Sequence, residues 1–299
     1  MYGFNKIILS RKGYDSSAGG DYSPFDPETG EYIVLPIPVK EEEAKIGNAT
    51  KYKEILIKAN YLPRCSASNT QELIDFLKKK QTINKIPSTY AHFDPWLGHC
   101  PWLDDSRNHN IGAFGQVGAA QTHLDKQGIK KGSLFIFFSR FVPTNTQRSN
   151  LEKGVYFIYG WLKVGKIIKR FEDIEDARLK QYHPHATKKY YTKHSNNTIY
   201  LADEFLFEGS SIPGCGYFNR LDKKLLLTSQ HDDIPSKWEL PLFFNRHKPT
   251  YFTKDVSKWR IHPDKNTCMV KSPARGQEFV FEESPEFDDW FRNLFQERN

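Results

Sequence analysis

The sequence predicts an α+β fold in which helices flank a mixed, largely antiparallel sheet that is curved or closes into a partial barrel. Two runs, 134–138 and 155–164, are apolar on both faces, which is typical of central strands covered on both sides. The polar loop between them favours an antiparallel hairpin in such a sheet. Segments 69–80 and 284–295 carry apolar stripes and predict helices.

Both predicted helices begin with suitable capping residues. Asn69 can cap the first helix, with Glu72 as its reciprocal partner, and three lysines suit its negative C-terminal end. Ser284 can cap the last helix, and Pro285 fits its first position.

The strand predicted at residues 7–9 ends in a polar, glycine-rich turn. Arg11, Lys12 and Asp15 follow the apolar run, and three glycines lie between positions 13 and 20. Fixed charges and free backbone N–H groups at a strand end can bind an anion. Arg11 and Asp15 are therefore candidate catalytic residues, and Lys12 is a candidate phosphate ligand.

Composition limits the class of protein. The 299 residues include 43 Lys and Arg against 36 Asp and Glu, a net charge of +7 that suits a polyanionic partner and also an ordinary soluble protein. The four cysteines form no CxxC pair, so zinc-finger spacing is absent and reduced thiols are expected. No apolar run approaches the roughly 18 residues of a membrane span. We expect a cytoplasmic protein with no membrane partner, and the sequence identifies no cofactor and assigns no metal site.

His92 and Asp94 form the first candidate constellation outside that turn. Pro95 and Pro101 exclude a regular element here, and an extended backbone would point His92 and Asp94 the same way. Such a pair can orient the imidazole as a general base or bind a metal. The alternative is a loop histidine bonded to a nearby carboxylate for structural reasons.

A helix is predicted over 115–126, with Gly128 as its stop. Gln116 and His123 would then lie two turns apart on one face. The small alanines between them suit close approach to a ligand. A tightly packed helix with solvated polar ends is the alternative.

Two further segments carry candidate nucleic-acid contacts. Residues 182–194 hold three Lys, three His and three Tyr with no acid, and cations interleaved with aromatics can pair phosphates and stack bases. A solvated basic loop is the alternative. Residues 275–278 place polar side chains just before a strand. The candidates in these segments are His183, His185, Lys188, Lys189, Arg275, Gln277 and Glu278.

The chain resembles the nucleotide modification associated domain 3 family of bacteria and their viruses. The resemblance implies one family-length domain over 1–299 and an association with enzymes that hypermodify bases in DNA, so that DNA is favoured over RNA. Ser133, where the family pattern leads us to expect Asp, and the pair Ser139-Arg140 depart from it. The matching segments are 7–20, 23–24, 35–38, 92–95, 114–124, 132–138, 159–165, 183–185 and 274–280.

Two functions remain open. The glycine-bounded strands around Trp161 are similar to the core of PUA-like barrels, which bind RNA or modified bases.

In the first hypothesis, an enzyme acts on a nucleotide or a base: Arg11 and Lys12 hold phosphate, and His92, oriented by Asp94, works with His123 or His183. Gln116, Gln277 and Glu278 would recognise a base edge.

In the second hypothesis, a non-catalytic reader binds modified nucleic acid through a cage that includes Trp161 and a basic rim at 182–194. Neither a G-x-S-x-G motif nor a Walker motif is present, which argues against a serine hydrolase and a P-loop NTPase.

Overall fold

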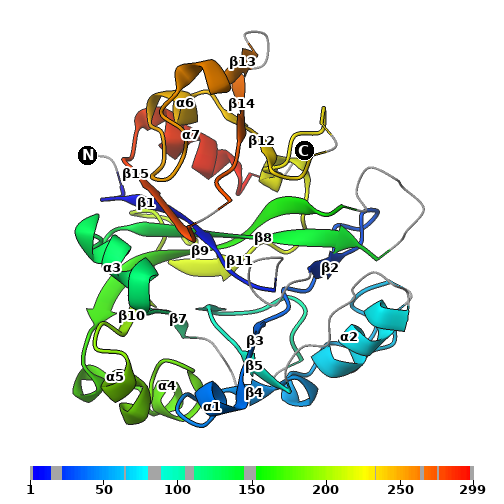
Figure 1. Cartoon of the computed structure of the whole chain (residues 1–299), viewed down its shortest axis with the longest axis vertical. Coiled ribbons are helices and arrows are strands. Elements are labelled where there is room, and N and C mark those ends of the chain that lie inside the picture. Colours follow the sequence, from blue (N-terminus) through cyan, green and yellow to red (C-terminus); the bar gives the residue numbers. More distant parts are fainter. Residues whose placement is uncertain are drawn as a thin grey trace.

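The computed structural model describes residues 3–14, 22–63, 65–79, 89–104, 111–144, 153–232, 234–262, 266–274 and 276–296. Within these residues, a nine-stranded sheet crosses the middle of the molecule, and smaller layers of sheet and helix lie against its two faces (Figure 1). This arrangement confirms the predicted α+β class.

The large sheet is mixed and largely antiparallel, as predicted. Strands β1 and β2 run parallel to β8, and the other pairs are antiparallel. No closed barrel forms among the described strands, since β15 and β6 stand at the two ends of the order. That order is β15 (Glu278–Phe281), β1 (Ile7–Arg11), β8 (Leu134–Pro143), β9 (Val155–Ile168), β10 (Thr198–Ala202), β7 (Gly112–Gln116) and β6 (Trp96–Leu97), with β2 (Ser23–Phe25) on β8 and β11 (Cys215–Tyr217) on β9.

Strands β8 and β9 form the predicted central hairpin. Their pairing shifts by one residue, because Phe137 faces Gly160 while Phe138 faces Ile158. Tyr159 is thus the extra residue of a β-bulge, a feature that re-aims a side chain. Its ring stacks on Phe137 at 6.2 Å between centroids.

A C-terminal layer covers one face of the sheet (Figure 1). Its core contains Trp238, which is fully buried and lies 5.1 Å from Phe138 between ring centroids. Ser284 caps the last helix as predicted, accepting a hydrogen bond from the Phe287 N–H at 3.2 Å. The layer consists of β12 (Lys237–Pro241), β14 (Thr267–Lys271), β13 (Arg260–His262), α6 (Phe243–Arg246) and α7 (Pro285–Asn293), with short 3₁₀ turns at Lys223–Leu225 and Val256–Lys258.

The opposite side of the molecule carries the N-terminal layer and three further helices (Figure 1). Asn69 caps α2, since its Oδ1 accepts a hydrogen bond from the Glu72 N–H at 3.0 Å. The elements are β3 (Ile37–Val39), α1 (Glu41–Ala44), β4 (Thr50–Lys51), α2 (Thr70–Lys79), β5 (Tyr90–His92), α3 (Gly118–Lys126), α4 (Ala177–Tyr182) and α5 (Lys188–Lys193), with 3₁₀ turns at Tyr52–Glu54 and Phe171–Asp173.

The helix predicted over 115–126 is wrong at its start. Residues 112–116 form β7, and α3 begins only at Gly118, whose φ of +62° separates the strand from the helix. Pairing with β10 and β6 determines the strand, and such tertiary pairing overrides local preference in a segment this short. Gln116 and His123 therefore do not share a helix face.

Two apolar cores occupy the molecule. One joins the central strands to the C-terminal layer, and the other joins the N-terminal layer to β7 and β10. The four cysteines are free thiols. In the described part of the chain, no helix is long and apolar enough to cross a membrane. The single-domain organisation over 1–299 stays a prediction.

Candidate functional site

Asp94 is the centre of a buried polar cluster at the edge of β7. Its Oδ1 accepts the Gly115 N–H at 3.1 Å and lies 3.1 Å from His183 Nε2. Its Oδ2 lies 3.8 Å from His185 Nε2 and receives a longer bond of 3.3 Å from Gly115 N–H. All three polar side chains are at most 7% exposed. Asp94, the carboxylate of the predicted His-x-Asp pair, therefore lies against two histidines from the segment 182–194.

The two histidines have opposite tautomers. His183 Nδ1 accepts the backbone N–H of His185 at 3.3 Å, so in the neutral ring the proton is on Nε2 and is donated to Asp94. His185 Nδ1 lies 2.7 Å from Asn197 Oδ1, while Asn197 Nδ2 donates to the His185 carbonyl at 2.9 Å. Because Asn197 offers an acceptor, His185 Nδ1 carries the proton, and the lone pair of Nε2 faces Asp94 Oδ2.

Local packing holds these rings in place. The His183 ring lies against Trp96, with 5.1 Å between centroids. Gly115 permits the approach of His185, because a Cβ built at Gly115 would lie 2.2 Å from that imidazole. Strand β7 therefore supplies both an N–H for Asp94 and the space for His185.

His92 completes the cluster from the solvent side. Its ring centroid lies 4.9 Å from that of His185, and one ligand atom each from His92, Asp94 and His185 lie within 4.8 Å of one another. The half-buried His92 lines a surface pocket of about 270 Å³. The other lining residues are Val39, Glu43, Gly47, Ala49, Pro184, Tyr190 and His194.

Burial lowers the pKa of His92 and His185, whereas hydrogen bonding lowers the pKa of Asp94. Desolvation lowers the pKa of His92 to about 4, although Asp94 opposes the shift. Desolvation also lowers the pKa of His185 well below its usual value. For Asp94, burial acts to raise the pKa, but the hydrogen bond from His183 and the nearby imidazoles hold it below its usual value.

A second buried group lies at the C-terminal end of β7. Lys12 Nζ is 2.7 Å from Glu278 Oε1, and Gln116 Nε2 donates to the same oxygen at 2.6 Å. Lys12 also lies over the Phe114 ring, 4.9 Å from its centroid. Gln116 Oε1 accepts the Val117 N–H at 3.1 Å. Lys12, Gln116 and Glu278, all predicted site residues, are thus brought together.

Three buried polar atoms near this group have no hydrogen-bond partner among the described residues: Glu278 Oε2, Ser10 Oγ and Tyr159 OH. Ser10 is the cross-strand partner of Glu278 and also pairs with Phe137, on which Tyr159 stacks. Buried polar atoms are almost always bonded, so these three atoms offer hydrogen-bonding capacity that the described residues do not use.

The two groups are electrostatically coupled. Gly115 binds Asp94 through its N–H, and the next residue, Gln116, binds Glu278. The charge of Lys12 contributes to the lowered pKa of His92, after burial and His183. Burial raises the pKa of Tyr159, and the charges of Asp94 and Glu278 raise it further.

Arg11 lies apart from both groups. Its guanidinium lies over Phe138 and Tyr156, and it donates to the Pro273 carbonyl at 3.4 Å. Since Phe138 packs on Trp238, Arg11 faces the C-terminal layer, whereas Lys12 faces Phe114 on the other side of the sheet. Neighbouring residues of a strand alternate in this way.

The remaining predicted residues are dispersed around the site. His123 Nε2 hydrogen-bonds Thr250 Oγ1 at 3.1 Å; burial lowers its pKa, and the charge of Glu278 opposes the shift. Gln277, Lys188 and Lys189 are exposed. Asp15 and Arg275 lie outside the described residues.

Three residues of the site carried little signal in the sequence. Asn197 fixes His185 but lies in a polar turn of ordinary composition. Tyr159 belongs to a strand rich in aromatic residues, so the sequence does not indicate a functional role for its hydroxyl. Ser10 was the most detectable, because it interrupts an apolar run directly before Arg11.

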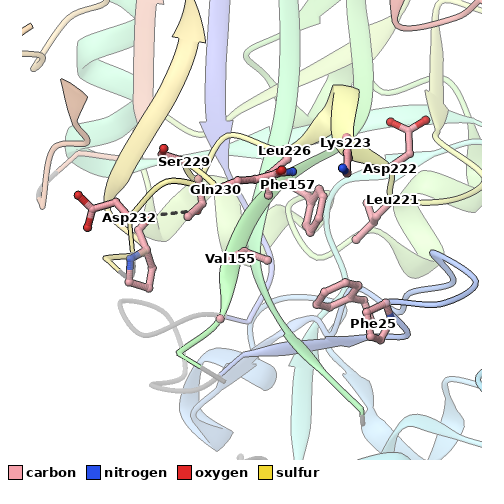
Figure 2. A pocket seen from close by; sticks show the side chains of 14 residues that line it. Phe25, Val155, Phe157, Leu221, Asp222, Lys223, Leu226, Ser229, Gln230 and Asp232 are labelled. Atoms are coloured by element: carbon pink, nitrogen blue, oxygen red, sulfur yellow. Dashed lines mark hydrogen bonds between the residues drawn. The ribbon is translucent and has the colours of Figure 1, made fainter. Parts of the chain in front are cut away.

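A separate pocket of about 290 Å³ lies where β9 begins (Figure 2). Its floor is apolar, with Phe25, Val155, Phe157 and Leu226, and its rim is polar. None of the predicted site residues lines it. The rim includes Asp222, Lys223, Ser229, Gln230 and Asp232.

The fold and site define an α+β protein whose large mixed sheet carries buried acid, base and amide groups at one strand end. The model of the nucleotide modification associated domain 3 family matches residues 6–282, and the chain belongs to this family. Neither a curated protein nor a solved structure matches the chain.

Proposed function

We propose that this chain is an enzyme that acts on a nucleotide or on a base in nucleic acid, DNA in preference to RNA. The family assignment supports the substrate class. The observation that carries the enzymatic role is the pair of buried polar groups that meet at β7, one around Asp94 and one around Glu278. Clusters of buried titratable groups are typical of active sites.

The cost of burying these groups supports a role beyond folding. A buried ion pair such as Lys12–Glu278 loses hydration that its attraction recovers only with good geometry and further hydrogen bonds. Here one carboxylate oxygen has no bond to the described residues. Such an arrangement contributes little net stability, so selection for binding or catalysis is the better explanation of it.

Each group has a distinct chemical role in this proposal. Glu278 Oε2, Tyr159 OH and Ser10 Oγ offer one acceptor and two hydroxyls, which match the mixed donor and acceptor edge of a base. His183 holds Asp94 in place, and His92 and His185 present unprotonated nitrogens. Lys12 supplies positive charge for a developing anion.

The alternative, a reader with an aromatic cage, is less well supported by the residues assigned to it. Trp161 is 7% exposed, its Nε1 donates to the Pro213 carbonyl at 3.0 Å, and Phe218 and Phe295 pack against its ring. It therefore serves the core of the protein and offers no open face to a base.

The test is incubation of the purified chain with nucleotides and with modified and unmodified DNA, followed by mass spectrometry of the products. We expect a mass change with at least one substrate, lost in Glu278→Gln and Asp94→Asn and retained in His99→Ala. His99 is an exposed histidine in the segment that holds His92, so its variant controls for a nonspecific effect of substitution. Tight binding of modified DNA with no mass change under any condition would favour the reader.

A further inference from the structure

We propose that His92, Asp94 and His185 bind a divalent first-row transition-metal ion. The three residues each offer one ligand atom, and these atoms lie within 4.8 Å of one another. Two imidazoles with one carboxylate suit Fe²⁺, Co²⁺, Ni²⁺ or Zn²⁺, whereas Mg²⁺ and Ca²⁺ prefer oxygen ligands. This set leaves coordination positions open for water and substrate.

The hydrogen bonds around the triad orient its ligand atoms. Asn197 takes the Nδ1 proton of His185, which leaves the Nε2 lone pair facing Asp94 Oδ2 at 3.8 Å. Two electron-rich atoms that face each other in a buried place repel unless a cation lies between them. Metal-binding histidines typically donate their other ring N–H to such an outer partner.

Asp94 is arranged as a ligand whose two oxygens are bound unequally, since Oδ2 receives only a longer bond of 3.3 Å from the Gly115 N–H. Its Oδ1 is held by His183 and Gly115 at 3.1 Å each, and its Oδ2 is turned toward His185. His183 is thus a positioning residue that orients the carboxylate.

The spacing of the ligand atoms and their access from solvent are both compatible with a bound metal ion. Two ligands about 2.0–2.2 Å from a tetrahedral metal are about 3.4 Å apart, so the triad needs only a modest side-chain adjustment to close. His92 lines the surface pocket of about 270 Å³, which gives an ion a route from solvent to the triad.

A catalytic role for this metal rests on the proposed function, but its binding does not. The experiment uses the full chain, stripped with a chelator and returned to metal-free buffer at neutral pH, and needs no substrate. Titration with Co²⁺, followed by visible absorption and calorimetry, is expected to show one equivalent bound, displaced by Zn²⁺ and not by Mg²⁺. An inactive chain that binds Co²⁺ would refute only the enzyme, and an active chain that binds none would refute only the metal.

The variants identify the ligands. His92→Ala and His185→Gln are expected to lose the Co²⁺ spectrum, and the outer-sphere change Asn197→Leu to weaken affinity by about 10–100-fold. His99→Ala is the matched control and is expected to bind normally. Circular dichroism checks the fold of each variant, and the half-buried His92 offers the change that least disturbs the core. No Co²⁺ binding by the folded, unaltered chain, or equal binding by folded His92→Ala, would overturn the proposal.

Discussion

His92 remains neutral at physiological pH because the cost of desolvating an imidazolium exceeds the attraction of nearby Asp94. The same balance acts on His185, where burial lowers the pKa well below its usual value. At this scale the environment, not the residue type, decides whether a histidine is a base, a ligand or a buried donor. His92, with a pKa of about 4, is too weak a base to accept a proton efficiently near pH 7.

The lowered pKa of His92 predicts acid sensitivity of the folded state. An unfolded histidine titrates near 6.5, whereas folded His92 titrates at about 4, so the unfolded chain binds more protons between these values. The free energy of unfolding therefore falls as the pH drops from about 6.5 to 4, by at most about 3 kcal/mol from this group. Urea unfolding at a series of pH values measures the effect.

The matched comparison uses His92→Gln and His99→Gln. His92→Gln is expected to flatten the pH dependence over that interval, and His99→Gln, at an exposed position, to leave it unchanged. Equal slopes for the original chain and His92→Gln would show that His92 titrates normally.

At the scale of elements, β7 serves both groups of the site. Its Gly115 N–H binds Asp94, its Gln116 binds Glu278, and its Phe114 ring lies under Lys12. A five-residue strand thus fixes the spacing between the two groups. Any change that moves β7 or the histidines packed on it should affect the site before it affects the rest of the fold.

Gly115→Ala is the substitution that tests this dependence. The added Cβ would lie 2.2 Å from the His185 ring, so the imidazole must shift away from Asp94. We expect loss of activity and of Co²⁺ binding, with a destabilisation of about 1–3 kcal/mol, typical of overpacking. Thermal unfolding and metal titration measure the two effects.

Gly3→Ala is the control for that substitution, since nothing lies within 4 Å of a Cβ built there. Normal metal binding and activity in Gly115→Ala would show that His185 does not need its observed position.

The elements that sequence could predict are those with strong local patterns. The hairpin of β8 and β9 follows from two long apolar runs, and the caps at Asn69 and Ser284 follow from side chains that bond the backbone. Strand β7 escaped prediction because its strand state depends on pairing with β6 and with β10, and β10 is distant in the sequence.

The candidate site shows the same difference between local patterns, which the sequence can predict, and long-range contacts, which it cannot. The sequence singled out His92 and Asp94 as a pair, and their ligand atoms lie within 4.8 Å of each other. It could not reveal that His183 and His185 lie against Asp94, because that contact joins residues about ninety positions apart. Alternation also implies that Arg11 and Lys12 point to opposite faces of the sheet, but the sequence could not show which layer each of them meets.

At the scale of the whole molecule, several of the basic residues behind the net charge of +7 line one groove. A groove of about 370 Å³ crosses the small sheet of β12, β14 and β13, and its lining includes Lys237, Lys258, Arg260 and Lys271. Lys237 and Lys258 pair with Asp232 and Asp255. Arg260 and Lys271 are exposed and have no ion-pair partner among the described residues.

This groove predicts a salt-dependent contact with the phosphates of DNA. The double variant Arg260→Glu with Lys271→Glu is expected to weaken binding to a DNA duplex regardless of its sequence. The slope of log affinity against log salt concentration should fall by about 2, one for each lost phosphate contact. Fluorescence anisotropy over a range of salt concentrations measures the slope.

Lys45→Glu, at an exposed position on the N-terminal layer, reverses a charge away from the groove and is the control. An equal loss of affinity in Lys45→Glu would mean that net charge alone drives binding, and an unchanged slope in the double variant would place the DNA elsewhere.

The position of β1 between β8 and β15 also has a consequence for how the protein is made. Lys12 and Glu278 are 266 residues apart in sequence and meet only when β15 is laid beside β1. Residue 278 must be synthesised before this ion pair can form. Until then, the edge of β1 that pairs with β15 is unpaired. Contacts of such long sequence separation slow folding, and an exposed edge invites aggregation. The same late step that completes the sheet also assembles the group of Lys12, Gln116 and Glu278, so a chain that lacks this pairing cannot form that half of the site.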